Sequence, residues 1–272
     1  MRRPRQLSSE DVEAFIHRGF CTLEGAFSRE QAAKVRSLVW DRMRAKAGID
    51  RDDPATWPET YDIEEHLDHP AVCGTFTDRL ARAVEDLVGV GRWNGSRSWG
   101  FWPVNFRFGA GEPYQIPSFG WHVDGNWFRH TIDCARQGLL LIGLFSDIAP
   151  RGGGTILSGG SHRITARVLA RHPEGLDHRE LFAEVLREPL GDFHEVTGRA
   201  GDVVLGHPFL FHTRGFKHVG EPRFISNAEC GLTDRMDFSR ASDADISPLE
   251  WSIRIAVNSP SAVPQGAMAC RF

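Results

Sequence analysis

The sequence changes character near Trp93, and this change constrains the fold more than any other feature. Beyond Trp93 the chain consists of short runs of branched and aromatic residues separated by glycine, proline and aspartate, a pattern typical of β-strands. We therefore expect a β core over residues 91–232, interrupted by a helical insertion at 163–187. The expected strands lie in the runs WGFWPVNFRF, QGLLLIGLFSDI, GTILSGGSH, FHEVTG, GDVVLGH and PRFISNAEC.

Helices are expected before and after this β core. Residues 1–90 are mainly helical in pattern, and one of their helices opens with Ser28 and Gln31 in the spacing of a capping box. Residues 233–272 contain the run SPLEWSIRIAV, which has an N-cap serine, a proline at the first helical position and a capping-box glutamate. These patterns predict a single α+β domain over residues 1–272, mainly β, with flanking helices.

Composition and charge narrow the range of partners. The 272 residues carry a formal net charge of −4, so neither nucleic acid nor an anionic membrane is an expected partner. The five cysteines are widely spaced, which argues against a disulfide framework or a structural zinc site. The basic N-terminus lacks the apolar segment of a secretion signal. We expect a cytoplasmic protein, monomeric or a small homo-oligomer, that acts on a small molecule.

The run FGWHVDGNWFRH places His122 and Asp124 one residue apart. In an extended chain, residues i and i+2 point to the same side, so this imidazole and this carboxylate can reach one metal ion. A second histidine would complete the set, and the segment 201–224 offers candidates. Two histidines and one carboxylate leave coordination positions open, which suits non-haem Fe(II) binding a co-substrate and dioxygen together.

In the order and spacing of its motifs, the chain resembles the phytanoyl-CoA dioxygenase family of Fe(II)/2-oxoglutarate-dependent oxygenases. The resemblance extends nearly from end to end and rests on LSSEDVEAFIHRGFCTLEG, the H-x-D pair, GGGTILSGGSH, GDVVLGHPFLFH and SPLEW. It implies a double-stranded β-helix, a jelly-roll or cupin-like barrel with the metal inside one mouth. It also implies Fe(II) as the metal, with 2-oxoglutarate and dioxygen as co-substrates.

The resemblance implies roles for four residues. His122, Asp124 and His212 hold the iron, because the family places its second histidine ligand at the end of an H-P-x-x-x-H run; His207, at the start of that run, then packs nearby. Arg223, eleven residues beyond His212, pairs with the distal carboxylate of 2-oxoglutarate, for which a planar guanidinium is suited. The carboxylate of Asp124 favours hydroxylation, desaturation or oxidative cyclisation, since related halogenases carry a small residue there.

Some positions depart from the family pattern. Arg214 stands two residues after the third ligand, where the family often has serine, and Lys217 stands where it often has asparagine. The hydroxyl groups of Thr213 and Thr155 are candidates for the missing co-substrate contact. Arg107 is a further candidate, because it lies on the strand before the H-x-D pair, where relatives often carry a basic residue.

Aromatic and polar residues around the H-x-D pair predict a substrate pocket. They are Trp99, Trp102, Asn126, Trp127, Phe128 and His130. Flat aromatic faces beside polar groups suit a sugar-like or polycyclic natural product, as in antibiotic biosynthesis. The surroundings of the pair also resemble the oxygenases that close orthoester linkages between sugars, as in hygromycin B and the orthosomycins. His66 and His178 are expected on the surface.

Two other classes of protein remain open. A non-oxygenase metal barrel of cupin type, an isomerase or lyase, would keep the metal ligands but has no use for Arg223. A metal-free binding module would keep only the barrel. Metal binding and 2-oxoglutarate binding together distinguish these classes from the oxygenase.

Overall fold

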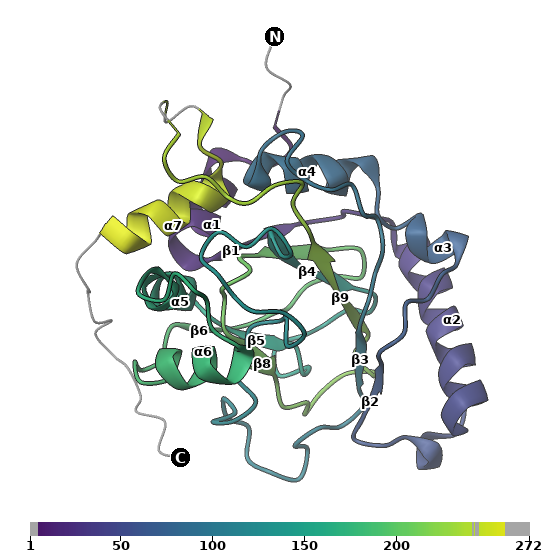
Figure 1. Ribbon diagram of the computed structural model, residues 1–272. Coiled ribbons are helices and arrows are strands. Elements are labelled where there is room, and N and C mark those ends of the chain that lie inside the picture. The colour runs from purple at the N-terminus through teal and green to yellow at the C-terminus, as the bar shows by residue number, and fades with distance from the viewer. Residues whose placement is uncertain (1–4, 241, 243–244, 259–272) are drawn as a thin grey trace.

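Two antiparallel sheets form the centre of the computed structural model, which describes residues 5–240, 242 and 245–258 (Figure 1). The larger sheet has the strand order β1-β7-β4-β9 and the smaller one β6-β5-β8, while β2 and β3 form a two-stranded ribbon. The strands are β1 (Phe20–Leu23), β2 (Thr60–Ile63), β3 (Trp102–Asn105), β4 (Leu139–Leu144), β5 (Thr155–Ser158), β6 (Phe193–Glu195), β7 (Val203–Gly206), β8 (His212–Arg214) and β9 (Ile225–Cys230). Each of the six predicted runs contains a strand. Three strands lie outside those six runs: β1 and β2, in the part expected to be mainly helical, and β8, which pairs with β5. Of these, β2 pairs with β3.

Alternate side chains of β4 enter two different cores, because neighbouring residues on a strand point to opposite faces. Leu140 and Ile142 pack with Leu157 of β5 in a core between the two sheets. Leu139 and Leu141 belong instead to the core that includes the buried faces of the helices. The larger sheet therefore has an inner face, toward the smaller sheet, and an outer face covered by helices.

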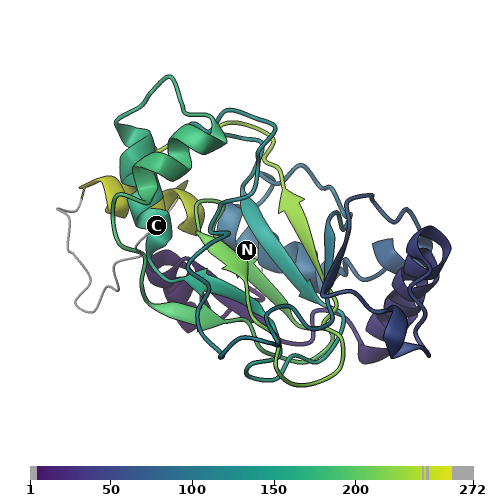
Figure 2. The ribbon, with the colours of Figure 1, turned by 90° about the horizontal axis from the view of Figure 1, so that it is seen from below.

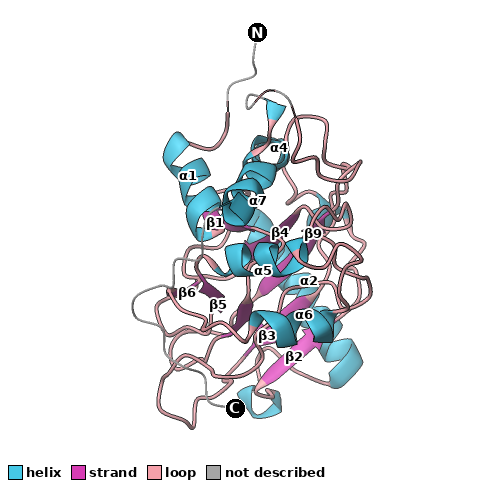
Figure 3. Ribbon diagram, turned by 60° about the vertical axis from the view of Figure 1, so that its left-hand side comes forward, coloured by secondary structure: helices cyan, strands magenta, loops and turns pink. Residues whose placement is uncertain are grey.

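The helices lie around the sheets rather than between them. They are α1 (Ser9–Arg18), α2 (Arg29–Ala47), the 3₁₀ turn η1 (Pro54–Thr56), α3 (Pro70–Cys73), α4 (Asp78–Val88), α5 (Ser161–Ala170), α6 (His178–Val185) and α7 (Pro248–Asn258). Figure 2 shows α2 at the opposite end of the molecule from α5 and α6, and Figure 3 shows α1, α4 and α7 gathered at one end of the strands. The predicted insertion at 163–187 corresponds to α5 and α6. In the part of the chain described here, no helix combines the length and hydropathy needed to cross a bilayer.

Hydrogen-bonded caps fix the starts of the helices. Ser28 accepts a hydrogen bond from the backbone of Gln31, whose side chain accepts one from the backbone of Ser28, so the predicted capping box of α2 is confirmed. Ser247 and Glu250 form the same reciprocal pair at the start of α7. These local signals are reliable because each cap satisfies backbone N–H groups that have no partner within the helix.

Glu250 also ties α7 to the rest of the chain. Its carboxylate oxygens accept hydrogen bonds from Arg92 (2.6 Å), Arg240 (3.1 Å) and the backbone of Asp237 (3.0 Å). Burial alone would raise the pKa of Glu250, but the hydrogen bonds from the backbone N–H groups of Asp237 and Ser247 and from Arg240 outweigh it and lower that pKa below its usual value of 4.5. The carboxylate therefore contributes stability that is present above pH 4.5 and is lost as the pH falls through the lowered value.

We expect Glu250→Gln to lower the free energy of unfolding at pH 7 by about 1–3 kcal/mol, because charge-assisted hydrogen bonds are lost and the cationic partners stay. The difference between wild type and variant should shrink as the pH is lowered below about 4.5, since the wild-type carboxylate then becomes protonated. Urea unfolding of both proteins at pH 7 and at a pH below 4.5 measures the difference in the free energy of unfolding. The control is Glu184→Gln, which breaks the surface pair with Arg187 and should change stability by less than about 0.5 kcal/mol. Equal effects of the two substitutions would contradict the expectation.

Candidate active site

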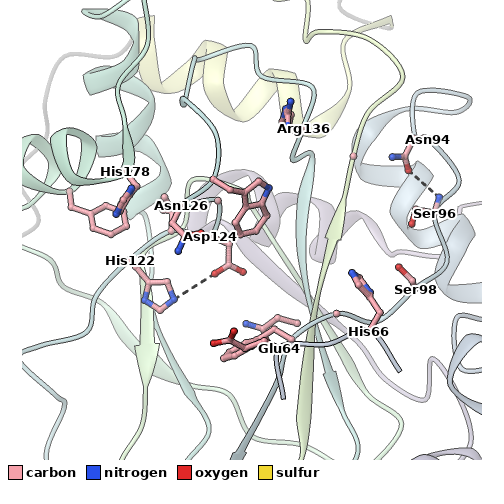
Figure 4. Close-up of a pocket in the computed structure, with 18 residues that line it drawn as sticks. Glu64, His66, Asn94, Ser96, Ser98, His122, Asp124, Asn126, Arg136 and His178 are labelled. Carbon is pink, nitrogen blue, oxygen red and sulfur yellow. Dashed lines mark hydrogen bonds and ion pairs between the residues drawn. The ribbon is translucent and has the colours of Figure 1, made fainter. Parts of the chain in front are cut away.

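Backbone hydrogen bonds hold two histidines from distant parts of the chain side by side. The N–H of His122 donates to the carbonyl of His212 (3.0 Å), and the N–H of His212 donates to the carbonyl of His122 (2.9 Å). Oδ1 of Asp124 lies 3.6 Å from Nε2 of His122 and 3.5 Å from Nε2 of His212. One potential ligand atom from each of the three residues lies within 4.8 Å of the others. The structure thus brings the three predicted ligands together, and Figure 4 shows His122 directed toward Asp124.

The two imidazoles are oriented as metal ligands require. Nδ1 of His122 lies 2.7 Å from the carbonyl oxygen of Gly120, and Nδ1 of His212 lies 3.1 Å from that of Leu210. A carbonyl only accepts hydrogen bonds, so both Nδ1 atoms carry the proton and both Nε2 atoms present a lone pair. Nε2 of His212 is buried and has no hydrogen-bond partner among the described residues. This unpaired nitrogen, facing a second imidazole and a carboxylate, fits a bound Fe(II) ion.

The charges at the site match this arrangement. Burial, and then the neighbouring His212, lower the pKa of His122 to about 4. Burial would raise the pKa of Asp124, but the imidazoles of His212 at 3.5 Å and His122 at 3.6 Å outweigh burial and lower that pKa. These directions favour a neutral His122 and an ionised Asp124, as metal ligands require. Burial would lower the pKa of His212, but the carboxylate of Asp124 outweighs burial and raises it, so a metal ion that binds Nε2 of His212 competes with a proton there.

The loop that carries the ligands is held by residues that the sequence analysis places in the substrate pocket. Gly125 has φ +105°, a conformation that favours glycine, and its carbonyl lies 2.9 Å from Nε2 of His130. The buried ring of His130 packs on Phe128, with ring centroids 4.7 Å apart. Neither His130 nor Phe128 lines the cavity beside the ligands, so both predictions of a substrate contact are corrected to a structural role.

Arg223 is buried on the inner face of the larger sheet. It lies two residues before Ile225, which packs in the core between the sheets, and it exchanges backbone hydrogen bonds with Asn105 (3.0 and 2.9 Å). Its Nε and Nη2 have no hydrogen-bond partner among the described residues, and it is only 1% exposed. Burial, and then the charge of Arg214, lower the pKa of Arg223 to about 9. A buried cation without a partner is costly, so this position fits a bound carboxylate.

The other predicted co-substrate residues differ in position. Thr155 lies opposite Arg214 in the register of β5 and β8, on the same face as His212, so its hydroxyl group belongs to the inner face. Thr213 lies on the opposite face and donates to the carbonyl of Phe119 (3.0 Å). Arg107 is exposed and follows the end of β3. The expectations for Thr213 and Arg107 are therefore corrected. Thr213 points away from the inner face because side chains alternate along β8, and Arg107 does not lie on β3 because that strand ends at Asn105.

A cavity of about 820 Å³ opens beside His122 and Asp124 (Figure 4). Asn126 and Trp127 line it, as predicted, and Trp127 is 61% exposed at its edge. Trp99 and Trp102 do not line it. Trp99 donates to the hydroxyl group of Thr75 (2.8 Å), and Trp102 packs against a phenylalanine of the core, so both belong to the outer-face core rather than to the cavity.

Most of the cavity wall comes from residues that the sequence analysis does not assign to the substrate pocket. They are Glu64, His66, Asn94, Ser96, Ser98, Gly100, Phe101, Val123, Gly125, Arg136, His178, Phe182, Asn227 and Gly231. His66 and His178, expected on the surface, are thus part of the cavity. In Figure 4, Glu64 lies below Asp124, and His66 lies across from His122 with Glu64 between them in the view. These residues come mainly from loops, where no periodic pattern in the sequence marks them.

Comparison with known proteins finds relatives in structure. No protein-family model and no curated protein matches the chain. HygX from Streptomyces hygroscopicus, solved with nickel, 2-oxoglutarate and hygromycin B, is 20% identical, with a TM-score of 0.52 over 84% of this chain and 88% of that one. EctD from S. alaskensis, solved with 2-oxoglutarate and 5-hydroxyectoine, is 18% identical, with a TM-score of 0.53 over 85% and 78%.

A third solved structure extends the set. SnoK, a non-haem alpha-ketoglutarate-dependent carbocyclase from nogalamycin biosynthesis, is 16% identical, with a TM-score of 0.57 over 87% of this chain and 89% of that one. HygX and EctD have also been solved with iron bound. At these identities the likeness is one of fold, and it agrees with the resemblance carried by the motifs. The chain therefore has the fold of non-haem, 2-oxoglutarate-dependent enzymes.

Proposed function

We propose that this protein is an Fe(II)- and 2-oxoglutarate-dependent oxygenase that hydroxylates or oxidatively cyclises a small molecule. His122, Asp124 and His212 hold the iron, and Arg223 holds the distal carboxylate of 2-oxoglutarate. When bound, iron together with 2-oxoglutarate and dioxygen would oxidise a carbon atom of the substrate, a reaction that side chains alone cannot perform. The proposal treats residues 1–272 as one oxygenase domain and the two facing sheets as a double-stranded β-helix.

The unpaired guanidinium of Arg223 is the observation that carries the proposal. A cupin-type isomerase or lyase needs the metal ligands but not a buried cation on the same inner face. A metal-free binding module needs neither. Three potential metal ligands and a guanidinium without an anionic partner thus occur together. This combination fits a co-substrate that chelates the metal at one end and carries a carboxylate at the other.

The cavity supports a substrate that is rich in hydroxyl groups. Amide and hydroxyl side chains such as Asn94, Ser98 and Asn227 supply hydrogen-bond donors and acceptors, and Trp127 supplies a flat apolar face. A fatty acyl chain would leave these polar groups unpaired. HygX is solved with hygromycin B bound, and SnoK comes from nogalamycin biosynthesis. We therefore propose a natural product of sugar-like or polycyclic character, as in antibiotic tailoring.

Anaerobic addition of Fe(II) and 2-oxoglutarate tests the proposal. We expect a visible metal-to-ligand charge-transfer band in wild type, because the keto acid chelates the iron. The band should disappear in His122→Ala and in His212→Ala, since each removes a ligand. The band is measured by absorbance spectroscopy of the protein mixed with Fe(II) and 2-oxoglutarate in buffer without oxygen.

His207→Ala is the matched control. The ring of His207 is buried between Phe15 and Phe209, with ring centroids 5.8 and 5.1 Å away, and it is not among the converging ligand atoms. Provided that circular dichroism shows a folded variant, the band should remain. A band that is lost in His207→Ala and kept in His212→Ala would reverse the ligand assignment.

A further inference from the structure

Arg214 lies on the inner face of the smaller sheet, together with a metal ligand. It is two residues after His212 on β8, so both side chains leave the strand on the same side. The register supports this, because His212 lies opposite Leu157, which packs in the core between the sheets, and Arg214 lies opposite Thr155 on the same strand. The guanidinium of Arg214 therefore starts from the face that carries the proposed iron site.

Asp62 meets Arg214 from the other side of this space. Nη2 of Arg214 donates to Oδ1 of Asp62 at 2.6 Å. Asp62 pairs with Pro103 on β3, and Asn105, two residues further on, pairs with Arg223. Paired residues of antiparallel strands share a face, so Asp62 and Arg223 lie on one face. The charges of Arg214 and Asp62 both reach Arg223, where the first lowers and the second raises its pKa.

The group formed by Asp62, Arg214 and Arg223 lacks negative charge. Two guanidinium groups face one carboxylate, which leaves one positive charge unbalanced. Lys217 lies near Arg223 as well, but Glu221 is its own anionic neighbour, so it does not change this balance. Asp62 accepts from Nη2 of Arg214, and within the described ranges no other group accepts a hydrogen bond from this guanidinium. Asp62 and Arg214 are 37% and 24% exposed, but Arg223 beside them is only 1% exposed, and a cation buried to that degree calls for an anion.

We propose that Arg214 is a second binding residue for the distal carboxylate of 2-oxoglutarate, so that guanidinium groups from two facing sheets grip it. This inference rests on the proposed function. Asp62 positions Arg214 by engaging one of its amino groups, which leaves the other N–H groups of the planar fork available to the carboxylate. The pair would select a keto acid that carries a second carboxylate over one that lacks it.

The test compares two keto acids by calorimetric titration into the Fe(II)-loaded protein without oxygen. Arg214→Gln should weaken 2-oxoglutarate binding by about 10- to 100-fold, the loss expected for charge-assisted hydrogen bonds, and should leave pyruvate and Fe(II) binding unchanged. Arg214→Lys should fall between, because it keeps the charge but not the planar fork. Asp62→Asn should not weaken 2-oxoglutarate, since it keeps an oxygen for Arg214 and removes a competing anion.

Arg167→Gln is the matched control, because it removes a similarly buried guanidinium from a pair with Glu188 on another part of the chain. Its affinity for both keto acids should equal that of wild type. The inference is overturned if Arg214→Gln and Asp62→Asn lower the melting temperature alike while the ratio of 2-oxoglutarate to pyruvate affinity stays within about threefold of wild type; the pair is then a structural bridge. If Arg223→Ala still weakens the binding of 2-oxoglutarate when Arg214→Gln does not, the oxygenase proposal stands. Failure of wild type to bind 2-oxoglutarate would overturn both.

Discussion

Asp124→Ala is expected to abolish oxidation of the substrate while the protein stays folded. The iron would lose its one anionic protein ligand, and the two remaining imidazoles do not hold the facial arrangement that leaves positions for co-substrate and dioxygen. Asp124→Glu should also be severely impaired, because one extra methylene displaces the oxygen from the two Nε2 atoms, now 3.6 and 3.5 Å away. Succinate release and substrate consumption, followed together, measure the loss.

Asp192→Asn provides the comparison for Asp124. Oδ1 of Asp192 also lies close to an imidazole, 2.9 Å from Nε2 of His194, but neither residue belongs to the group of potential metal ligands. Turnover should be unchanged in this variant. Full oxygenase turnover in Asp124→Ala would remove Asp124 from the ligand set.

Arg223→Ala is expected to cause a selective loss of 2-oxoglutarate affinity. Removing one partner of a buried charge pair typically costs about 2–5 kcal/mol, so the affinity should fall by roughly one and a half to three and a half decades. Arg223→Lys should recover only part of it, because an ammonium group cannot form two parallel hydrogen bonds. Fe(II) affinity should hardly change, and pyruvate, which has no distal carboxylate, should bind wild type and variant about equally poorly.

Arg107→Ala is the control for this loss, because the structure places Arg107 at an exposed position beyond β3. It should bind 2-oxoglutarate as wild type does. If Arg223→Ala binds 2-oxoglutarate within about threefold of wild type, a difference of about 0.7 kcal/mol, another residue holds the carboxylate.

The placement of His122 beside Asp124 was predictable because it depends on a local spacing: the two residues alternate along one extended segment. His212 and Arg223 were predicted instead from the resemblance to the family, since the spacing alone left several candidates in the segment 201–224. The structure then brings His122 and His212 together through a backbone pairing. Their roles in binding iron and co-substrate remain predictions until the titrations are made.

Other parts of the site depend on information that a single strand does not contain. Thr213 and Arg107 were misplaced because their faces depend on the strand ends and on register, which tertiary pairing determines. The ion pair of Asp62 and Arg214 joins β2 to β8, and no sequence pattern around either residue predicts this contact. The cavity residue Glu64 comes from the region expected to be mainly helical, where β2 was missed.

The backbone pairing of His122 with His212 also determines when, during folding, the proposed iron site is complete. A nascent chain that has not yet produced β8 contains only two of the three ligands, and the third arrives only when distant segments close on each other. A metal that binds only the closed chain stabilises it by mass action, by about 2.7 kcal/mol at one hundred times its dissociation constant. If the proposed iron site is occupied in the cell, we therefore expect the iron-loaded protein to open and to be degraded less often than the iron-free protein.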